Sequence, residues 1–66
     1  MLTPRQRELY LFLVAFERQH GYPPTQQQMA QALGLAKSGA NRHLAGLVRS
    51  GLVKRKPNSP RGVRLA

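Results

Sequence analysis

The chain has 66 residues, with no cysteine and two histidines, which excludes a disulfide framework and leaves too few ligands for a zinc site. Eleven lysines and arginines stand against two acids, Glu8 and Glu17, and give a formal net charge of +9. Two carboxylates without a nucleophile–base set do not supply an enzyme active site. We therefore expect a single non-enzymatic domain over residues 1–66, without cofactor or metal, whose partner is a polyanion such as nucleic acid.

The longest apolar run covers residues 9–16, which is shorter than the roughly 20 residues that a membrane-spanning helix needs. The beginning of the chain also lacks the cleavage site of a secretory signal peptide. We therefore expect a cytoplasmic, nucleoid-associated protein without a membrane partner.

A first helix is predicted over residues 4–20. Thr3 is a suitable N-cap, Pro4 suits the first helical position, and Gln6 completes a capping box. Gly21 and the prolines that follow it end the helix. The inward face carries four apolar residues at helical spacing, Leu9, Phe12, Leu13 and Phe16.

The opposite face of this helix is also apolar, since it carries Tyr10, Leu11 and Val14. Two interpretations stay open for it. Either neighbouring elements bury the helix on all sides, or this face binds a partner protein or a second copy of the chain.

Residues 21–25 form a rigid connector because they contain two consecutive prolines. We expect Tyr22 in this connector to pack on the core. A second helix over residues 26–33 starts with another capping box, in which Thr25 is the N-cap and Gln28 follows three residues later.

A third helix is predicted over residues 37–50, ending at Gly51. Beyond it, the pattern predicts two strands, 52–56 and 61–65, joined by a turn over residues 57–60. These strands form a hairpin with a basic tip. The side chains of the third helix expected to point inward are Ala40, Leu44, Leu47 and Val48.

The second and third helices have the spacing of a helix-turn-helix. Ala30 is small where the two helices cross, Gly34 can adopt a positive φ in the turn, and Ala40 faces back into the crossing. With the hairpin as a wing, the sequence predicts a mainly α fold, the winged helix-turn-helix. In such folds the start of the third helix enters the major groove of DNA.

Polar residues at the start of the third helix are therefore predicted to read DNA bases. Arg42 suits a bidentate contact with guanine, and Asn41 suits adenine. Lys37 and Ser38 lie near the positive end of the helix, where they suit phosphate or base-edge acceptors. Gly39 is either needed for close approach to the DNA or is a tolerated surface glycine. The predicted base-reading residues are Lys37, Ser38, Gly39, Asn41 and Arg42.

The basic hairpin is predicted to contact the DNA backbone. His43 either touches a phosphate or is a partly buried structural histidine. Arg5 and Arg7 in the first helix are further candidates on the flank, whereas His20 is expected only to end that helix. The predicted backbone-contacting residues are Thr25, Gln26, His43, Lys54, Arg55, Lys56 and Arg61.

Several segments of the chain resemble the amino-terminal DNA-binding domain of the LexA repressor family. They are Leu2-Thr3-Pro4-Arg5-Gln6 at the start, Gly21-Tyr22-Pro23-Pro24-Thr25 in the connector, Ala30-Gln31-Ala32-Leu33-Gly34 in the turn, His43-Leu44 in the third helix, and Arg61-Gly62-Val63-Arg64-Leu65 in the wing. This resemblance implies a repressor that binds palindromic operators as a dimer, in a family associated with the SOS response.

The chain departs from that family in two ways. The self-cleaving carboxy-terminal domain, with its Ser/Lys pair, has no counterpart in these residues, so we expect either a fragment or a stand-alone relative. The segment 34–44 is one residue shorter than the LexA pattern and is similar to a run in other winged-helix regulators, with Ala36 in place of a capping serine. The base-reading residues and the operator of the family therefore do not transfer.

Two other functions stay open. The apolar back face of the first helix would suit a protein-interaction or dimerisation module, and the positive charge would suit RNA. Readers of single-stranded RNA display aromatic stacking platforms. Here Phe12, Phe16 and Tyr22 are expected in the core, which argues against RNA.

Overall fold

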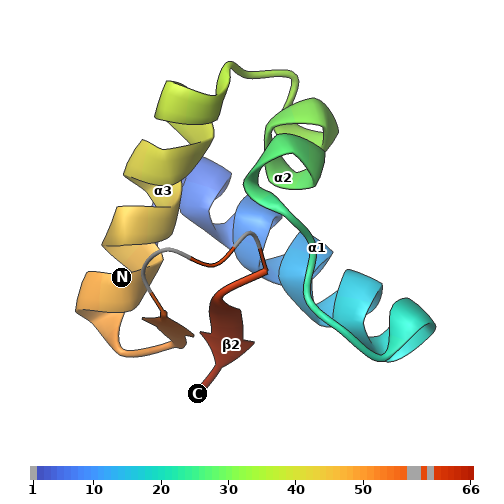
Figure 1. Ribbon diagram of the computed structural model, residues 1–66. Helices are drawn as coiled ribbons and strands as arrows, with labels where there is room; N and C mark the ends of the chain where they lie inside the picture. Colours follow the sequence, from blue (N-terminus) through green and yellow to red (C-terminus); the bar gives the residue numbers. More distant parts are fainter. Residues whose placement is uncertain (1, 57–58, 60) are drawn as a thin grey trace.

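In the computed structural model, which describes residues 2–56, 59 and 61–66, three helices are followed by a hairpin (Figure 1). The helices are α1 (Pro4–His20), α2 (Gln26–Leu33) and α3 (Lys37–Ser50), and the strands are β1 (Val53–Arg55) and β2 (Val63–Leu65). In Figure 1, α1 passes behind α3 and runs to the lower right, and β2 lies near the carboxyl-terminal half of α3. This arrangement is the predicted winged helix-turn-helix.

The helix boundaries agree with the prediction, whereas the strands are shorter than predicted. The two strands are antiparallel, and Lys54 lies opposite Arg64 in the register. The predicted turn over residues 57–60 lies mostly outside the described residues.

Two of the three helices begin with a complete capping box. The Thr3 hydroxyl accepts a hydrogen bond from the Gln6 amide at 3.2 Å, and the Gln6 side chain accepts one from the Thr3 amide. Thr25 and Gln28 make the same pair of bonds at the start of α2. In contrast, the N-cap of α3 is Ala36, whose backbone is extended like the other two caps but whose side chain makes no capping bond. The start of α3 therefore lacks the side-chain cap that α1 and α2 have.

The core combines all three helices and the base of the wing. Its most buried residues are Leu9, Leu13, Met29, Ala30, Leu33, Ala40, Leu44, Leu47, Val53 and Val63. Tyr10 and Phe12 pack against this cluster while remaining partly exposed. Since Tyr10 belongs to the predicted back face of α1, that face is partly covered, and Leu11 is its exposed member at 59%.

One inward prediction for α3 was wrong. Val48 is 36% exposed, because at 100° per residue it lies at the edge of the stripe formed by Leu44 and Leu47. Gly46 is buried instead, because α1 approaches closely there. A Cβ atom at Gly46 would lie 2.9 Å from Cδ of Gln6, the side chain that also completes the α1 capping box.

The prediction that Tyr22 packs on the core was also wrong. Tyr22 is 46% exposed, and Pro24 is fully buried. Within the connector, Pro24 fills the core position, and the Tyr22 ring lies outside the core. The Tyr22 ring instead meets Phe16 edge-on, with centroids 5.9 Å apart, and His20 stacks on Phe16 at 4.2 Å. We call Phe16, His20 and Tyr22 the aromatic cluster.

Candidate nucleic-acid interface

The amino-terminal half of α3 presents a polar surface. Ser38 and Arg42 are exposed on the side opposite the buried Ala40. Lys37 is exposed, and Asn41 half-buried, on the side that faces the wing. A hydrogen bond links this side of α3 to the wing, since Nη2 of Arg55 donates to Oδ1 of Asn41 at 3.4 Å.

Gly39 does not share this outward direction. It is half-buried, and a Cβ atom built on it would lie 3.5 Å from Cβ of Leu35. The position therefore faces the side chain that fills the turn between α2 and α3. An alanine would fit there at ordinary van der Waals distance.

A shallow groove of about 500 Å³ separates the starts of α2 and α3 from the wing. It brings together five residues that the sequence predicted as DNA contacts, although they come from three separate parts of the chain. It also contains Gln27 and Ser59, which the sequence analysis missed because neutral polar residues on a helix start and a turn carry no distinctive signal. Its lining residues are Thr25, Gln26, Gln27, Lys37, Arg55, Lys56 and Ser59.

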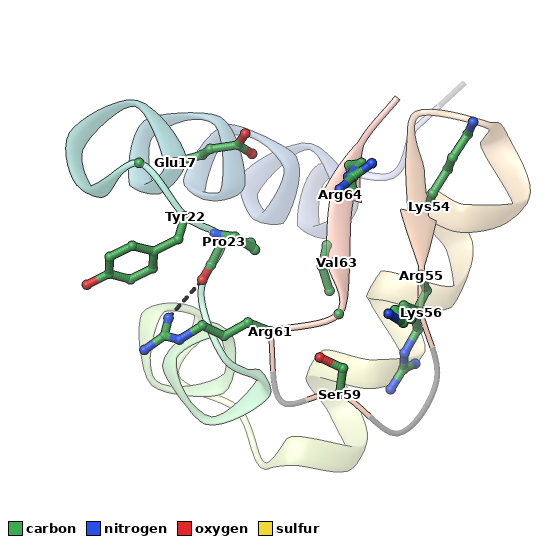
Figure 2. Close-up of a pocket in the computed structure, with 12 residues that line it drawn as sticks. Glu17, Tyr22, Pro23, Lys54, Arg55, Lys56, Ser59, Arg61, Val63 and Arg64 are labelled. Atoms are coloured by element: carbon green, nitrogen blue, oxygen red, sulfur yellow. Dashed lines mark hydrogen bonds between the residues drawn. The ribbon is translucent and has the colours of Figure 1, made fainter.

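Two predicted backbone contacts lie away from this groove. Lys54 is exposed opposite Arg64, and it points from β1 in the opposite direction to Arg55 (Figure 2). Strand alternation explains this, since successive side chains point to opposite faces. His43 is half-buried on the inner side of α3, in agreement with the structural alternative for this residue.

Arg61 is also directed away from the groove lining. Its Nη1 atom donates to the carbonyl oxygen of Pro23 at 2.8 Å and to Oε1 of Gln28 at 3.3 Å. Its guanidinium carbon lies 4.6 Å from the centroid of the Tyr22 ring. Figure 2 shows the Arg61 side chain reaching from the wing to the connector. No local pattern in the sequence indicates this arrangement, because Arg61 lies more than 30 positions after its partners.

Among the described residues, none of those that line the groove is acidic. Across the described residues the ion pair found is Arg5 with Glu8, at 3.3 Å. Arg5 also donates to the carbonyl oxygen of Leu33 at 3.1 Å. A positive charge at this place stabilises the carboxyl end of α2. The positive charges of Lys37, Arg55 and Lys56 are therefore not neutralised by neighbouring carboxylates.

In the part of the chain that the structure describes, no helix is both long enough and apolar enough to cross a bilayer. Nor do residues 2–56, 59 and 61–66 gather three or more His, Asp or Glu side chains where a metal ion could bind.

Comparison with known proteins places the chain in a family. The LexA DNA binding domain family matches residues 1–62. The chain belongs to the LexA DNA-binding domain family. It is 42% identical to the LexA repressor of Geobacter metallireducens and 40% identical to that of Pseudomonas aeruginosa, in each case over 97% of this chain and 32% of the relative. The LexA repressor of Thermotoga maritima is 37% identical over 98% of this chain. The chain thus spans about a third of the length of these relatives.

The segments that resemble LexA have distinct physical roles in this fold. In the connector, Pro24 fills a core position and Thr25 caps α2. In the wing, Arg61 reaches the connector, Gly62 lies against the Lys56 backbone, and Val63 enters the core. Two of the LexA-like segments, the connector and the end of the wing, therefore fix the wing and α2 relative to each other.

Proposed function

We propose that this LexA-type domain binds duplex DNA sequence-specifically on the nucleoid and thereby contributes to transcriptional repression. The observation that carries the proposal is the cationic groove between α2, α3 and the wing, whose described lining residues include no acid. Such a surface suits a polyanion. With α3 in the major groove, the wing would lie along the adjacent backbone.

The residues divide by the contact they are suited to make. Arg42, exposed on α3, would read guanine, and Asn41 would contribute a second base contact. Lys37 and Lys56 would contact phosphates on either side of the groove. The uncapped start of α3 adds backbone N–H donors of Ser38 and Gly39 that suit a phosphate.

Arg55 is suited to a DNA contact and also contacts a predicted base-reading residue. It lines the groove and also donates to Asn41. Removing it would therefore disturb a phosphate contact and the orientation of a base-reading amide together. Lys56, which is exposed at the same end of the wing, is the better probe of a pure backbone contact.

The proposal is tested by selecting bound duplexes from a random pool and titrating the best sequence against a scrambled one. Arg42→Ala is expected to reduce discrimination at one base position by about 1–3 kcal/mol. Lys56→Ala is expected to weaken all duplexes alike and to lower the salt slope by about 1. Equal losses on matched and scrambled duplexes for both variants would reject the role of Arg42.

A second candidate function is association through α1, by which the domain would bind a two-fold operator as a homodimer. It is favoured by Leu11, which is 59% exposed between the half-buried Tyr10 and Val14. Sedimentation of Leu11→Asp with and without a two-fold duplex tests it. A loss of two-to-one complexes would support a dimer, and unchanged stoichiometry would reject this face.

RNA binding is less well supported than duplex DNA binding. Tyr22 and Phe16 are more exposed than the sequence predicted, which reopens the question of a stacking platform. However, Arg61 covers one face of the Tyr22 ring, and Phe16 meets both Tyr22 and His20. These rings contact one another, so they do not offer the open faces on which bases stack.

A further inference from the structure

We infer that Arg61 is a positioning residue that holds the wing against the connector, and that it assists DNA binding in this way instead of through a phosphate contact. The inference rests on the proposed function for its effect on DNA. Its structural part concerns the free protein and can be judged without DNA.

The first argument is the number of protein groups that one guanidinium engages. Nη1 of Arg61 donates to the Pro23 carbonyl oxygen at 2.8 Å and to Gln28 Oε1 at 3.3 Å. The same guanidinium lies over the Tyr22 ring at 4.6 Å (Figure 2). Hydrogen bonds from a charged donor are stronger than neutral ones, and stacking on an aromatic face adds to them.

The second argument is where these partners lie. Oε1 of Gln28 also accepts from the Thr25 amide at 2.8 Å, so the same oxygen completes the α2 capping box. Pro23 and Tyr22 belong to the connector that leads into this cap. Arg61 thus ties the wing to the first turn of α2, which forms one wall of the cationic groove.

The wing is small, and among its described residues few side chains beyond its base contact the helices. Each strand has three residues, and a two-stranded hairpin of this size is marginally stable by itself. Val53 and Val63 anchor its base in the core, and Leu52 and Leu65 pack against it. Toward the tip, the bond from Arg55 to Asn41 reaches α3 on one side, and Arg61 reaches the connector on the other.

Positioning and phosphate contact differ in what they require of Tyr22. A phosphate-binding Arg61 would work equally well beside a leucine at position 22. A positioning Arg61 depends on the tyrosine ring, although that ring carries no charge. Tyr22→Leu, Arg61→Gln and the double variant therefore form the decisive set. Arg64→Gln is the matched control, because it removes the same charge from the exposed face of β2.

The first measurement is amide hydrogen exchange in the free protein. The reporter is the Lys56 amide, which donates to the Gly62 carbonyl within the wing. Arg61→Gln is expected to speed its exchange about tenfold, and Tyr22→Leu about threefold. Arg64→Gln is expected to leave it unchanged. Unchanged exchange in Arg61→Gln, or an equal increase in Arg64→Gln, would overturn the inference.

The second measurement is affinity for a selected duplex in a double-variant cycle. We expect Tyr22→Leu to weaken binding, and the double variant to bind no worse than Arg61→Gln. Additive losses, or a Tyr22→Leu variant that binds like the wild type, would assign Arg61 to a phosphate and overturn the inference. If the wild type binds no duplex, the proposed function fails, and the exchange rates decide the structural part alone.

Discussion

The helix-turn-helix and the wing are held in place by different kinds of interaction. Where α2 and α3 cross, Ala30, Leu33, Ala40 and Leu44 are buried, and apolar packing of this kind is non-directional. Above its base, the wing depends on directional bonds from the guanidinium groups of Arg55 and Arg61. The difference teaches that α3 is fixed by the core along its length, whereas the described part of the wing beyond Val53 and Val63 is held by a few charged side chains.

The largest effect is expected from Leu44→Ala in the helix-turn-helix. Leu44 is fully buried, so its truncation should lower the free energy of unfolding by about 2–5 kcal/mol. Thermal unfolding followed by circular dichroism measures this, with the half-exposed Val48→Ala as control. A Leu44→Ala variant that melts with the wild type would contradict the contrast between the two regions.

The second-largest effect is expected from Gly62→Ala in the wing. A Cβ atom at Gly62 would collide with the carbonyl oxygen of Lys56 and lie 3.0 Å from Cβ of Ser59. Gly62→Ala should therefore open the hairpin locally at a cost of about 1–3 kcal/mol, with little change in the unfolding of the helices. Wing amide exchange, helix melting and duplex affinity measured together test this. Loss of helix stability equal to that of Leu44→Ala would show that the two regions are not separable.

A smaller effect, which is a gain in stability and not a loss, is expected from a new N-cap at the start of α3. Ala36 already has the extended backbone of an N-cap, with φ −71° and ψ 163°, but lacks an acceptor. Ala36→Ser should add about 1 kcal/mol to the free energy of unfolding, which raises the melting temperature by roughly 4–8 °C in a domain of this size. Ala36→Val is the control, because valine gives no side-chain acceptor and is as poor an N-cap as alanine. A serine variant that melts at the same temperature as the wild type would show that the cap adds nothing.

The smallest effect is expected from Gly39→Ala. Alanine is favoured over glycine in a helix by about 0.5–1 kcal/mol, and the added methyl group has room against Leu35. Because this position faces the turn, we expect a slight rise in melting temperature and no loss of duplex affinity. A clear loss of affinity would instead favour the close-approach interpretation of this glycine.

The helices could be predicted from the sequence because their signals are local. Thr3 with Gln6, and Thr25 with Gln28, start α1 and α2, and Gly21, Gly34 and Gly51 end the helices in left-handed conformations. Spacing also predicted the burial of Ala30 and Ala40. Each of these signals lies within a few residues of the feature it determines.

The remaining features depend on contacts between distant parts of the chain. Tyr22 was expected in the core because it is aromatic, yet its partner Arg61 lies 39 positions later. The phosphate contact predicted for Arg61 is untested, and we infer a positioning role in its place; the other proposed DNA contacts remain predictions. Charge identified Lys37, Arg55 and Lys56 as candidates, but only the packing of the wing against α2 and α3 shows that they share one groove while Lys54 does not.

The meeting of Gln6 with Gly46 has a consequence for sequence variation. The Gln6 side chain completes the capping box of α1, and it also occupies the space beside Gly46 on α3. A larger residue at position 46 would displace that glutamine and remove its bond to the Thr3 amide. Positions 6 and 46 should therefore change together among related sequences, so that a bulkier residue at one is accompanied by a shorter residue at the other.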